Sequence, residues 1–206
     1  QPMVAKKVRT FNLSSNPGGW PTANSTTLTD YSYTLDGVDY TFALKNVKCS
    51  TGYLMLTKTA VLGLPAFADY KLTKVVATNS SGCSTSVKVG VSSSASAADY
   101  ISGGAAQTWS EKSSSYTYDL TETANNTVYY LYVTNRNAQI VSLELTYVSE
   151  GGVNEPTFTP ADDEFVGSVD VTLTADSGAT ILYSLDGTAP SITIDRNSVT
   201  PENNGD

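Results

Sequence analysis

The sequence predicts an all-β protein, a jelly-roll-like antiparallel β-sandwich followed by a small, partial immunoglobulin-like β module. Runs of β-branched and aromatic residues recur at short intervals, and clusters of Gly, Pro, Asn, Asp and Ser separate them. Because almost no helical periodicity lies between these runs, we expect antiparallel strands packed in two layers. The chain has 13 tyrosines and 5 phenylalanines, which is typical of half-exposed sheets where a ring packs and its hydroxyl stays in water. An immunoglobulin-like sandwich is the alternative topology for the larger part.

The strands can be placed in chain order. The first is predicted over residues 4–11, and a loop rich in turn formers over residues 14–25 follows it and carries Trp20. A hairpin is predicted around Asp36-Gly37, because both central residues of a type I′ turn need a positive φ. Further strands are expected over residues 53–57, 71–79, 85–94, 115–120, 127–135 and 139–147.

The last of these runs has the clearest pattern. Ile140 is apolar, and then Val141, Leu143, Leu145 and Tyr147 alternate with Ser142, Glu144 and Thr146. Side chains of a strand point alternately to its two faces, so this pattern predicts a half-buried strand with one solvated face.

A boundary is predicted near residue 150, where the charge balance changes. Residues 1–149 carry 11 Lys/Arg and 9 Asp/Glu, whereas residues 150–206 carry one Arg and 11 Asp/Glu. We therefore expect a sandwich over residues 1–148, a linker over 149–152, and a partial immunoglobulin-like repeat with a frayed tail over 153–206. Strands of the repeat are expected in residues 156–160, 169–175 and 180–185, before a second Asp-Gly turn at 186–187.

Composition also narrows the class of partner and the compartment. The net charge of −8 argues against nucleic acid, since phosphate binding needs clustered Lys and Arg. No run of 18 apolar residues exists, so no transmembrane segment is predicted. The chain opens QPMVAKK without a leader pattern. Either the protein is cytosolic or its leader peptide has been removed, and the low Lys/Glu content and the Ser/Thr/Asn-rich strands favour the second, a secreted or cell-surface protein.

The cysteines and acidic residues suggest no metal site. If the protein is exported, Cys49 and Cys83 could join neighbouring strands as a disulfide; two free, buried thiols are the alternative. The chain has no histidine, and two separate cysteines cannot complete a zinc tetrahedron. The cluster at residues 162–164 is interpreted as a solvated turn rather than a calcium loop. We expect no cofactor.

Residues 156–191 resemble the chitobiase/β-hexosaminidase C-terminal repeat, a small immunoglobulin-like domain. The matching positions are Pro156, Pro160, Gly167, Val169, Val171, Leu173, Ile181, Tyr183, Ser184, Asp186, Gly187 and Pro190. The resemblance implies that Tyr183 is a core residue, that Asp186-Gly187 forms a turn, and that the chain has an exported, modular, glycan-associated architecture.

Residues 1–148 resemble, more loosely, a β-sandwich domain of secreted and surface proteins of gut-type anaerobic bacteria. The likeness is carried by the segments FNLSSNPGGWP, DGVDYTFAL, YLMLTKTAVLGLPAF and NAQIVSLELTY. It implies a non-catalytic, glycan-associated or adhesive module, and it brings no catalytic residues with it.

The residues themselves favour binding over catalysis. Without histidine, no Ser-His-Asp or Cys-His arrangement is available, and no acidic pair stands out as a glycosidase site. Sugar-binding modules stack pyranose faces on aromatic rings and orient hydroxyls with amides and Arg. The candidate ligand-binding residues are Trp20, Trp109, Asn135, Arg136, Asn137 and Gln139. Their alternatives are tryptophans that close the core and an ordinary loop between two strands.

Three functions are thus carried forward. The first is a carbohydrate-binding module with a spacer repeat, whose partner is a polysaccharide or another glycan. The second is a cell-adhesion or scaffold protein that contacts another surface protein through an apolar patch or a strand edge. The third is an accessory fragment of a larger glycoside hydrolase.

Overall fold

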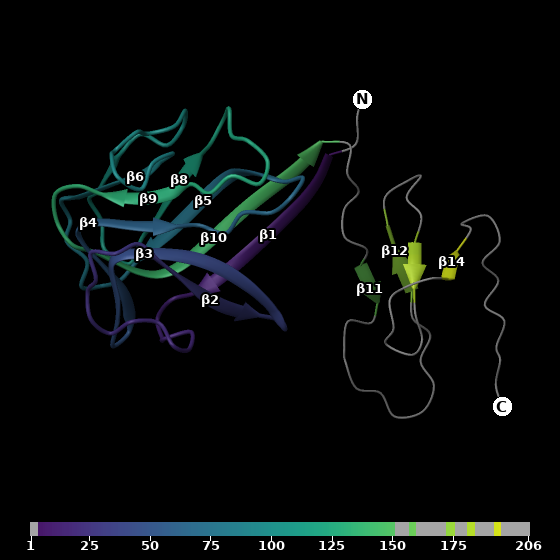
Figure 1. The fold of residues 1–206 in the computed structure, drawn as a ribbon, viewed down its shortest axis with the longest axis horizontal. Coiled ribbons are helices and arrows are strands. Elements are labelled where there is room, and N and C mark those ends of the chain that lie inside the picture. Colours follow the sequence, from purple (N-terminus) through teal and green to yellow (C-terminus); the bar gives the residue numbers. More distant parts are fainter. Residues whose placement is uncertain (1–3, 151–156, 160–171, 176–180, 184–191, 195–206) are drawn as a thin grey trace. The chain divides into compact units, whose positions relative to one another are not determined.

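The computed structural model describes residues 4–150 and four short segments, 157–159, 172–175, 181–183 and 192–194. Two compact units are distinguished, one of Lys6–Glu150 and one that contains Gly151–Asp206 together with Gln1–Ala5. The regular elements of the described residues are all strands (Figure 1). The predicted all-β class is therefore confirmed.

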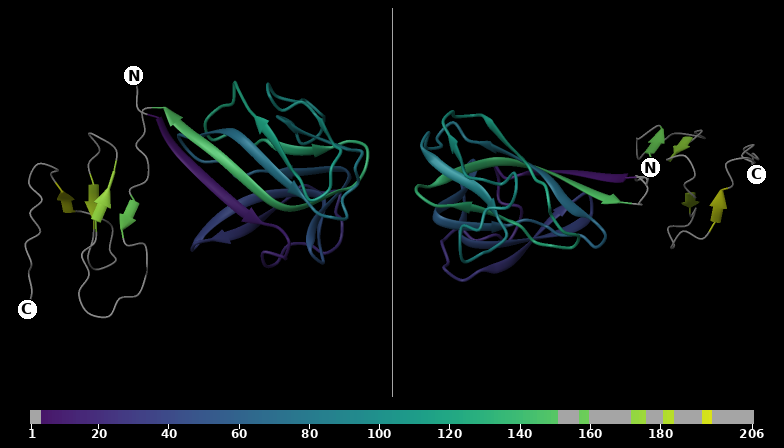
Figure 2. Two further views of the ribbon diagram at one scale, coloured as in Figure 1. Left: turned by 180° about the vertical axis from the view of Figure 1, so that it is seen from behind. Right: turned by 90° about the horizontal axis from the view of Figure 1, so that it is seen from above.

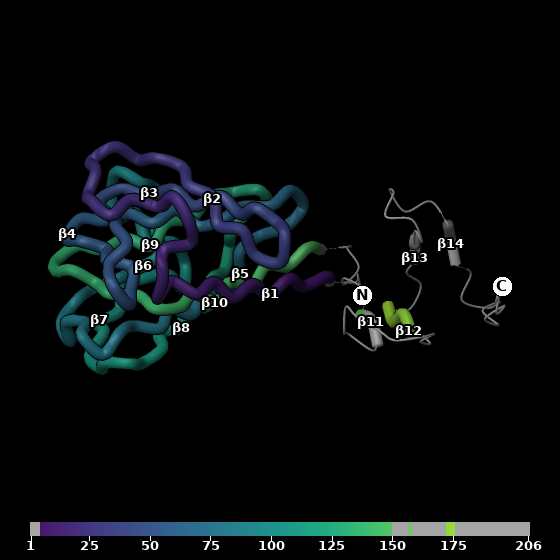
Figure 3. The backbone as a smooth tube through the Cα atoms, turned by 90° about the horizontal axis from the view of Figure 1, so that it is seen from below, coloured from purple at the N-terminus to yellow at the C-terminus, as the bar shows by residue number. Residues whose placement is uncertain are grey.

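Ten strands build the larger unit. They are β1 (Val4–Asn12), β2 (Thr29–Leu35), β3 (Val38–Ser50), β4 (Tyr53–Gly63), β5 (Lys71–Asn79), β6 (Val87–Ser92), β7 (Gln107–Trp109), β8 (Ser115–Asp119), β9 (Tyr130–Val133) and β10 (Ala138–Glu150). Hydrogen bonds link them in the order β7-β6-β9-β4-β10-β5-β8, with β3 beside β4, β2 beside β3, and β1 beside β10. The sheet curls into a nearly closed, sandwich-like body (Figure 2), and β1 and β10 lie side by side along one margin (Figure 3).

Strand β4 belongs to both layers of this body, because it changes partner halfway along its length. Leu54–Leu56 pairs with β10, whereas Val61–Gly63 pairs with β9. Strand β3 accompanies β4 on its other edge, but its register skips between Lys45 and Val47. On β4 the irregular stretch is residues 57–60, where Thr59 has a φ of 70°. The two layers are thus halves of one continuous sheet that fold apart at this break.

A β-bulge in β10 explains an irregularity in the predicted alternation. The register against β5 shifts between Ile140 and Ser142, and a bulge places one extra residue in a strand and changes its phase. Ile140 and Leu143 are therefore both buried although they are three residues apart, and Val141 is only half-buried. Beyond the bulge, Leu145 and Tyr147 are buried as the alternation predicts, but Thr146, which was expected on the solvated face, is buried as well, beside a second register shift between Thr146 and Tyr147.

The hairpin around Asp36-Gly37 forms as predicted. Strands β2 and β3 pair from Thr29↔Leu44 to Leu35↔Val38, and Asp36 and Gly37 both have positive φ values, 51° and 76°. Asn46 also has a positive φ, 54°, at the register shift between β3 and β4.

Some element boundaries differ from those predicted. Strand β7 was not expected, and it places Trp109 opposite Val87 of β6 rather than in a loop. Strand β4 continues to Gly63, past the bulge, and β10 continues to Glu150. Residues 149 and 150 are therefore strand, and the predicted linker begins too early in the chain.

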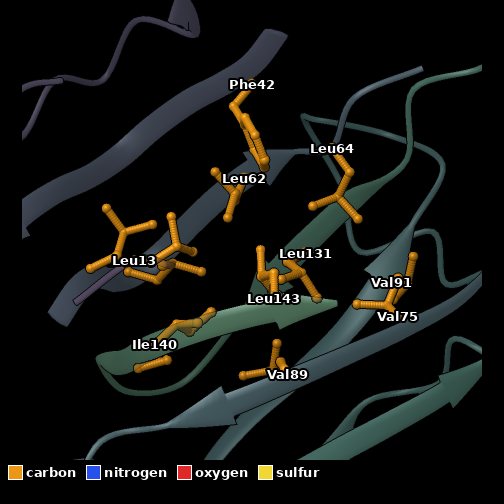
Figure 4. Packing of buried hydrophobic residues seen from close by; sticks show 14 of the residues in the cluster. Leu13, Phe42, Leu62, Leu64, Val75, Val89, Val91, Leu131, Ile140 and Leu143 are labelled. Atoms are coloured by element: carbon orange, nitrogen blue, oxygen red, sulfur yellow. The ribbon is translucent and has the colours of Figure 1, made fainter. Parts of the chain in front are cut away.

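The core lies between the two halves of the sheet. Phe42, Leu62, Leu131 and Val89 come from β3, β4, β9 and β6, and they face Ile140, Leu143 and Val75 from β10 and β5 (Figure 4). Each of these seven side chains is fully buried. Burying such a side chain stabilises a fold by about 1.5–3 kcal/mol. This interior therefore holds β9 and β10 in place, and with them the polar turn that connects these two strands.

The second unit has four described strands in two hairpin pairs. Strand β11 (Thr157–Thr159) pairs with β12 (Thr172–Thr174), and β13 (Ile181–Tyr183) pairs with β14 (Ile192–Ile194). The predicted acidic turn at residues 162–164, the turn at 186–187 and the tail after 195 lie outside the described residues.

Candidate functional site

Trp20 is a core residue. Its ring is only 3% exposed and packs against Phe42 with ring centroids 5.3 Å apart. The indole Nε1–H donates to the carbonyl of Ser32 at 2.6 Å, and Asn16 bonds the Trp20 backbone through both its Oδ1 and its Nδ2. The expectation that this loop tryptophan offers a ring face to a ligand is corrected, because the loop folds the ring inward.

Trp109 is likewise a core residue, with 0% of its surface exposed. It stacks on Tyr116 with centroids 5.2 Å apart and an interplanar angle of 12°. Its Nε1–H donates to the Tyr118 hydroxyl, which in turn donates to the carbonyl of Val89. Burial raises the pKa of Tyr118, so this hydroxyl remains protonated and keeps both bonds. Trp109 is also not a sugar platform.

The four polar candidates come together around one pocket. Its volume is about 460 Å³, which lies in the range of small-molecule sites. It is lined by Met55 and Lys58 of β4, Gly82 and Ser84 of the β5–β6 loop, Asn135, Arg136 and Asn137 of the β9–β10 turn, and Gln139 of β10. Several of these side chains are exposed, so the pocket opens to solvent.

The break in β4 creates this pocket. Strand β9 pairs with the second half of β4 and β10 with the first half, so the turn between β9 and β10 must cross the bulge at residues 57–60. There, the backbone N–H of Lys58 donates to Asn137 Oδ1 at 2.8 Å. The bulge therefore turns Lys58 toward the same opening as the turn.

Asn135 holds the turn against β6. Its Oδ1 accepts from the backbone N–H of Lys88 at 2.8 Å, and its Nδ2 donates to the carbonyl of Ser86 at 2.8 Å. Both polar ends of this side chain are thus occupied by backbone groups. The predicted role as a ligand contact becomes that of a positioning residue.

Gln139 is fixed from the opposite wall. Its Oε1 accepts from the Ser80 hydroxyl, its carbonyl accepts from the Ser80 N–H at 3.0 Å, and Ser80 Oγ accepts from the N–H of Gly82 at 3.2 Å. A Cβ on Gly82 would lie 2.9 Å from Gln139 Oε1. Because glycine has no Cβ, residue 82 leaves room for the Gln139 carboxamide at the pocket.

The polar side chains of the pocket leave more hydrogen-bond donors than acceptors available to a ligand. The acceptor oxygens of Asn137 and Gln139 are occupied by the protein, whereas their NH₂ groups have no hydrogen bond to any described residue. Lys58 and Arg136 also make no ion pair within the described part of the chain, and no Asp or Glu lines the pocket. Chemically, the site can donate hydrogen bonds and attract negative charge.

The structure assigns Lys58, Met55, Gly82 and Ser84 to the site, and sequence reasoning missed all four. Lys58 lies between two threonines just after a predicted strand, and nothing in that pattern signals a bulge. Met55 is directly opposite Gln139 in the register of β4 and β10. This pairing could be found only once the strand order was known.

The two cysteines are free thiols. Cys49 lies on β3 and Cys83 follows β5, and β4 and β10 separate these two strands. Adjacent strands are about 4.8 Å apart, so a disulfide between neighbouring strands is not formed. Burial raises the pKa of both thiols. Both are therefore protonated at neutral pH.

Within the described ranges, no three His, Cys, Asp or Glu side chains form a group that could hold a metal ion. No helix in the described part of the chain is long and apolar enough to cross a membrane. Comparison of the chain with family models and with curated proteins found no match in either case.

Proposed function

We propose that the larger unit is a non-catalytic carbohydrate-binding module of a secreted or surface protein, and that the second unit is a spacer repeat. The observation that carries this proposal is the pocket formed by Lys58, Arg136, Asn137 and Gln139. Sugars are recognised by amide and guanidinium groups held at fixed positions beside an apolar contact. The resemblances to a chitobiase-type repeat and to a surface β-sandwich support the same class.

The pocket contains the parts that such binding needs. Asn137 and Gln139 each retain an NH₂ group without a hydrogen bond to a described residue, whereas their oxygens accept from the protein, so both NH₂ groups can donate to a ligand. The half-buried thioether of Met55 and the aliphatic stem of Lys58 offer an apolar surface to the C–H face of a sugar ring. These groups replace the stacking tryptophans that the sequence suggested.

The same features favour binding over catalysis. The pocket has no carboxylate, and glycoside hydrolysis by the usual route needs two. The neighbouring thiol of Cys83 is protonated at neutral pH because burial raises its pKa, and a protonated thiol is a poor nucleophile. Among the residues that the structure describes, the exposed large apolar ones, Val8, Leu28, Val38 and Val128, come from four separate segments, and no observation on them favours adhesion.

A glycan array screened with the whole chain, followed by isothermal titration calorimetry, tests the proposal. We expect at least one class of glycan to bind, and Arg136→Gln to weaken its binding about tenfold or more, as expected for loss of one charged hydrogen-bond donor. Lys88→Gln is the matched control, because Lys88 is exposed and lies on β6 outside the pocket. An array without any binder, or equal losses in both variants, would overturn the proposal.

A further inference from the structure

We infer that the pocket selects acidic sugars, those that carry a carboxylate or a sulfate group. This inference rests on the proposed glycan-binding function and adds the chemical class of the ligand. Some polar atoms of the pocket already form hydrogen bonds within the protein, and those that do not determine which ligand groups the pocket can bind.

The first step concerns the orientation of the two carboxamides. A backbone N–H can only donate, so the atom of Asn137 that faces the N–H of Lys58 must be its oxygen. Its nitrogen then carries two N–H groups that make no hydrogen bond to a described residue. Gln139 Oε1 is similarly occupied by the Ser80 hydroxyl, which already accepts from the N–H of Gly82.

The second step concerns charge. Lys58 and Arg136 are exposed side chains that line the same pocket as Asn137, and each has a positive charge that no described acidic residue pairs at the pocket. Arg provides a planar fork of donors that matches carboxylate and sulfate oxygens, and Lys adds a point charge. Both ammonium and guanidinium groups and both NH₂ groups can only donate, while each carboxamide oxygen has already accepted one hydrogen bond from the protein. Open donors therefore outnumber open acceptors on Lys58, Arg136, Asn137 and Gln139, and two of the donors are cationic.

The third step compares ligands. A neutral sugar presents hydroxyls, which both donate and accept, and its hydroxyl protons would find only the Ser84 hydroxyl and the remaining lone pairs of the two carboxamide oxygens as side-chain acceptors. A carboxylate or sulfate presents acceptors only and matches all four groups. The unequal set of groups thus favours an anionic substituent at the centre of the pocket, with the sugar ring against Met55.

An isosteric substitution tests this directly. Asn137→Asp keeps an oxygen for the Lys58 N–H but replaces the NH₂ with an anionic acceptor. We expect binding of an acidic oligosaccharide to fall about 100-fold, whereas neutral sugars, whose hydroxyls can donate to the new carboxylate, lose little. Asn125→Asp makes the same charge change at an exposed loop position outside the pocket and serves as the control.

The ligands should be matched pairs measured by calorimetry with the whole chain. Trigalacturonate against its methyl ester tests the carboxylate, and a sulfated chondroitin tetrasaccharide against its desulfated form tests the sulfate. We expect at least one acidic member to bind tenfold or more tighter than its neutral partner, and to shift the side-chain NH₂ signals of Asn137 and Gln139 in NMR spectra.

Each other outcome has a defined meaning. Equal binding of charged and neutral members would overturn the acidic selectivity and leave the glycan-binding function standing. Equal losses in Asn137→Asp and Asn125→Asp would show general charge attraction and would also overturn it. Absence of binding to any member of these pairs, on a chain that binds a neutral glycan on the array, would overturn only the acidic selectivity. Absence of binding to every glycan would overturn both proposals.

Discussion

Two loops of the larger unit use asparagine side chains in the same way and produce opposite results. In the loop after β1, Asn16 bonds the backbone of Trp20 and holds that ring inside the core. In the turn after β9, Asn135 and Asn137 bond the backbones of β6 and β4 and leave Arg136 in solvent. The difference comes from what lies beneath each loop. The first loop lies over the apolar core, where the Trp20 ring packs against Phe42. The second loop crosses the break in β4, where the side chain of Lys58 is exposed.

This contrast separates residues that stabilise the fold from residues that are free to bind a ligand. Substitutions in the aromatic interior should lower the free energy of unfolding, and substitutions at the rim of the pocket should lower affinity.

Trp20→Ala should cost about 3–5 kcal/mol, because it removes a buried ring and leaves the Ser32 carbonyl without its donor. Urea unfolding followed by circular dichroism would measure this loss. Arg136→Gln, measured in parallel, should change stability by less than about 0.5 kcal/mol. A Trp20→Ala protein of normal stability that had lost ligand binding would instead place this ring in the site.

Tyr118→Phe should cost about 2 kcal/mol, because Trp109 Nε1–H loses its acceptor and the Val89 carbonyl loses its donor. The substitution should also change how the free energy of unfolding depends on pH in the alkaline range. Since burial raises the pKa of Tyr118 in the folded state, its stabilising contribution is complete below the unfolded pKa of about 10 and is lost as pH rises further.

Urea titrations at about pH 7 and about pH 11 would measure this effect. The free energy of unfolding should fall less between these two pH values in Tyr118→Phe than in the unsubstituted protein. Tyr147, whose pKa burial also raises, keeps part of that dependence in both proteins. Tyr53→Phe is the control, since the Tyr53 hydroxyl has no hydrogen bond to a described residue. An unchanged alkaline slope in Tyr118→Phe would contradict the burial of this hydroxyl.

Asn135→Ala should cost about 1 kcal/mol, because two hydrogen bonds are lost at an exposed position, one between the turn and Lys88 of β6 and one between the turn and Ser86 just before β6. Ligand affinity should fall as well, although both polar atoms of Asn135 bond the backbone, because the turn that carries Arg136 is no longer fixed. Thermal unfolding and calorimetry on the same sample would measure both effects. Loss of stability with unchanged affinity would show that the turn is held in place without Asn135.

Gly82→Ala should have the smallest effect on stability, within about 0.5 kcal/mol. The added Cβ would lie 2.9 Å from Gln139 Oε1, so the carboxamide must move and the pocket must narrow. We expect affinity to fall several-fold with little change in the unfolding midpoint. A matched Gly37→Ala variant, at a turn with a φ of 76° and open space around it, should show the reverse.

Local patterns were sufficient for most of the strands. The hairpin at Asp36-Gly37 and the strand over residues 71–79 formed where the residue pattern predicted, because turn chemistry and β-branched runs act over a few neighbouring residues. The bulges at Val141 and at residues 57–60 were not predicted. A bulge is set by the partner strand, and its sequence signal is weak.

The candidate site was half predictable for the same reason. The segment from Asn135 to Gln139 was identified because its amides and Arg are contiguous in a turn. Lys58, 79 residues before Asn137, joins them only through the β4 bulge. Trp20 was misplaced because a loop position does not reveal which way a ring turns, and Trp109 was misplaced because its short strand, β7, was not predicted.

The sequence by itself determined the all-β class, the position of most strands and the polar content of the β9–β10 turn, since all of these depend on local periodicity and turn preferences. The tertiary structure decided the partner exchange of β4, the inward turn of Trp20 and Trp109, and the occupation of the Asn137 and Gln139 oxygens. These features require contacts between distant parts of the chain. The exchange of partners by β4 and the occupied carboxamide oxygens also explain why the β9–β10 turn lines a pocket rich in hydrogen-bond donors.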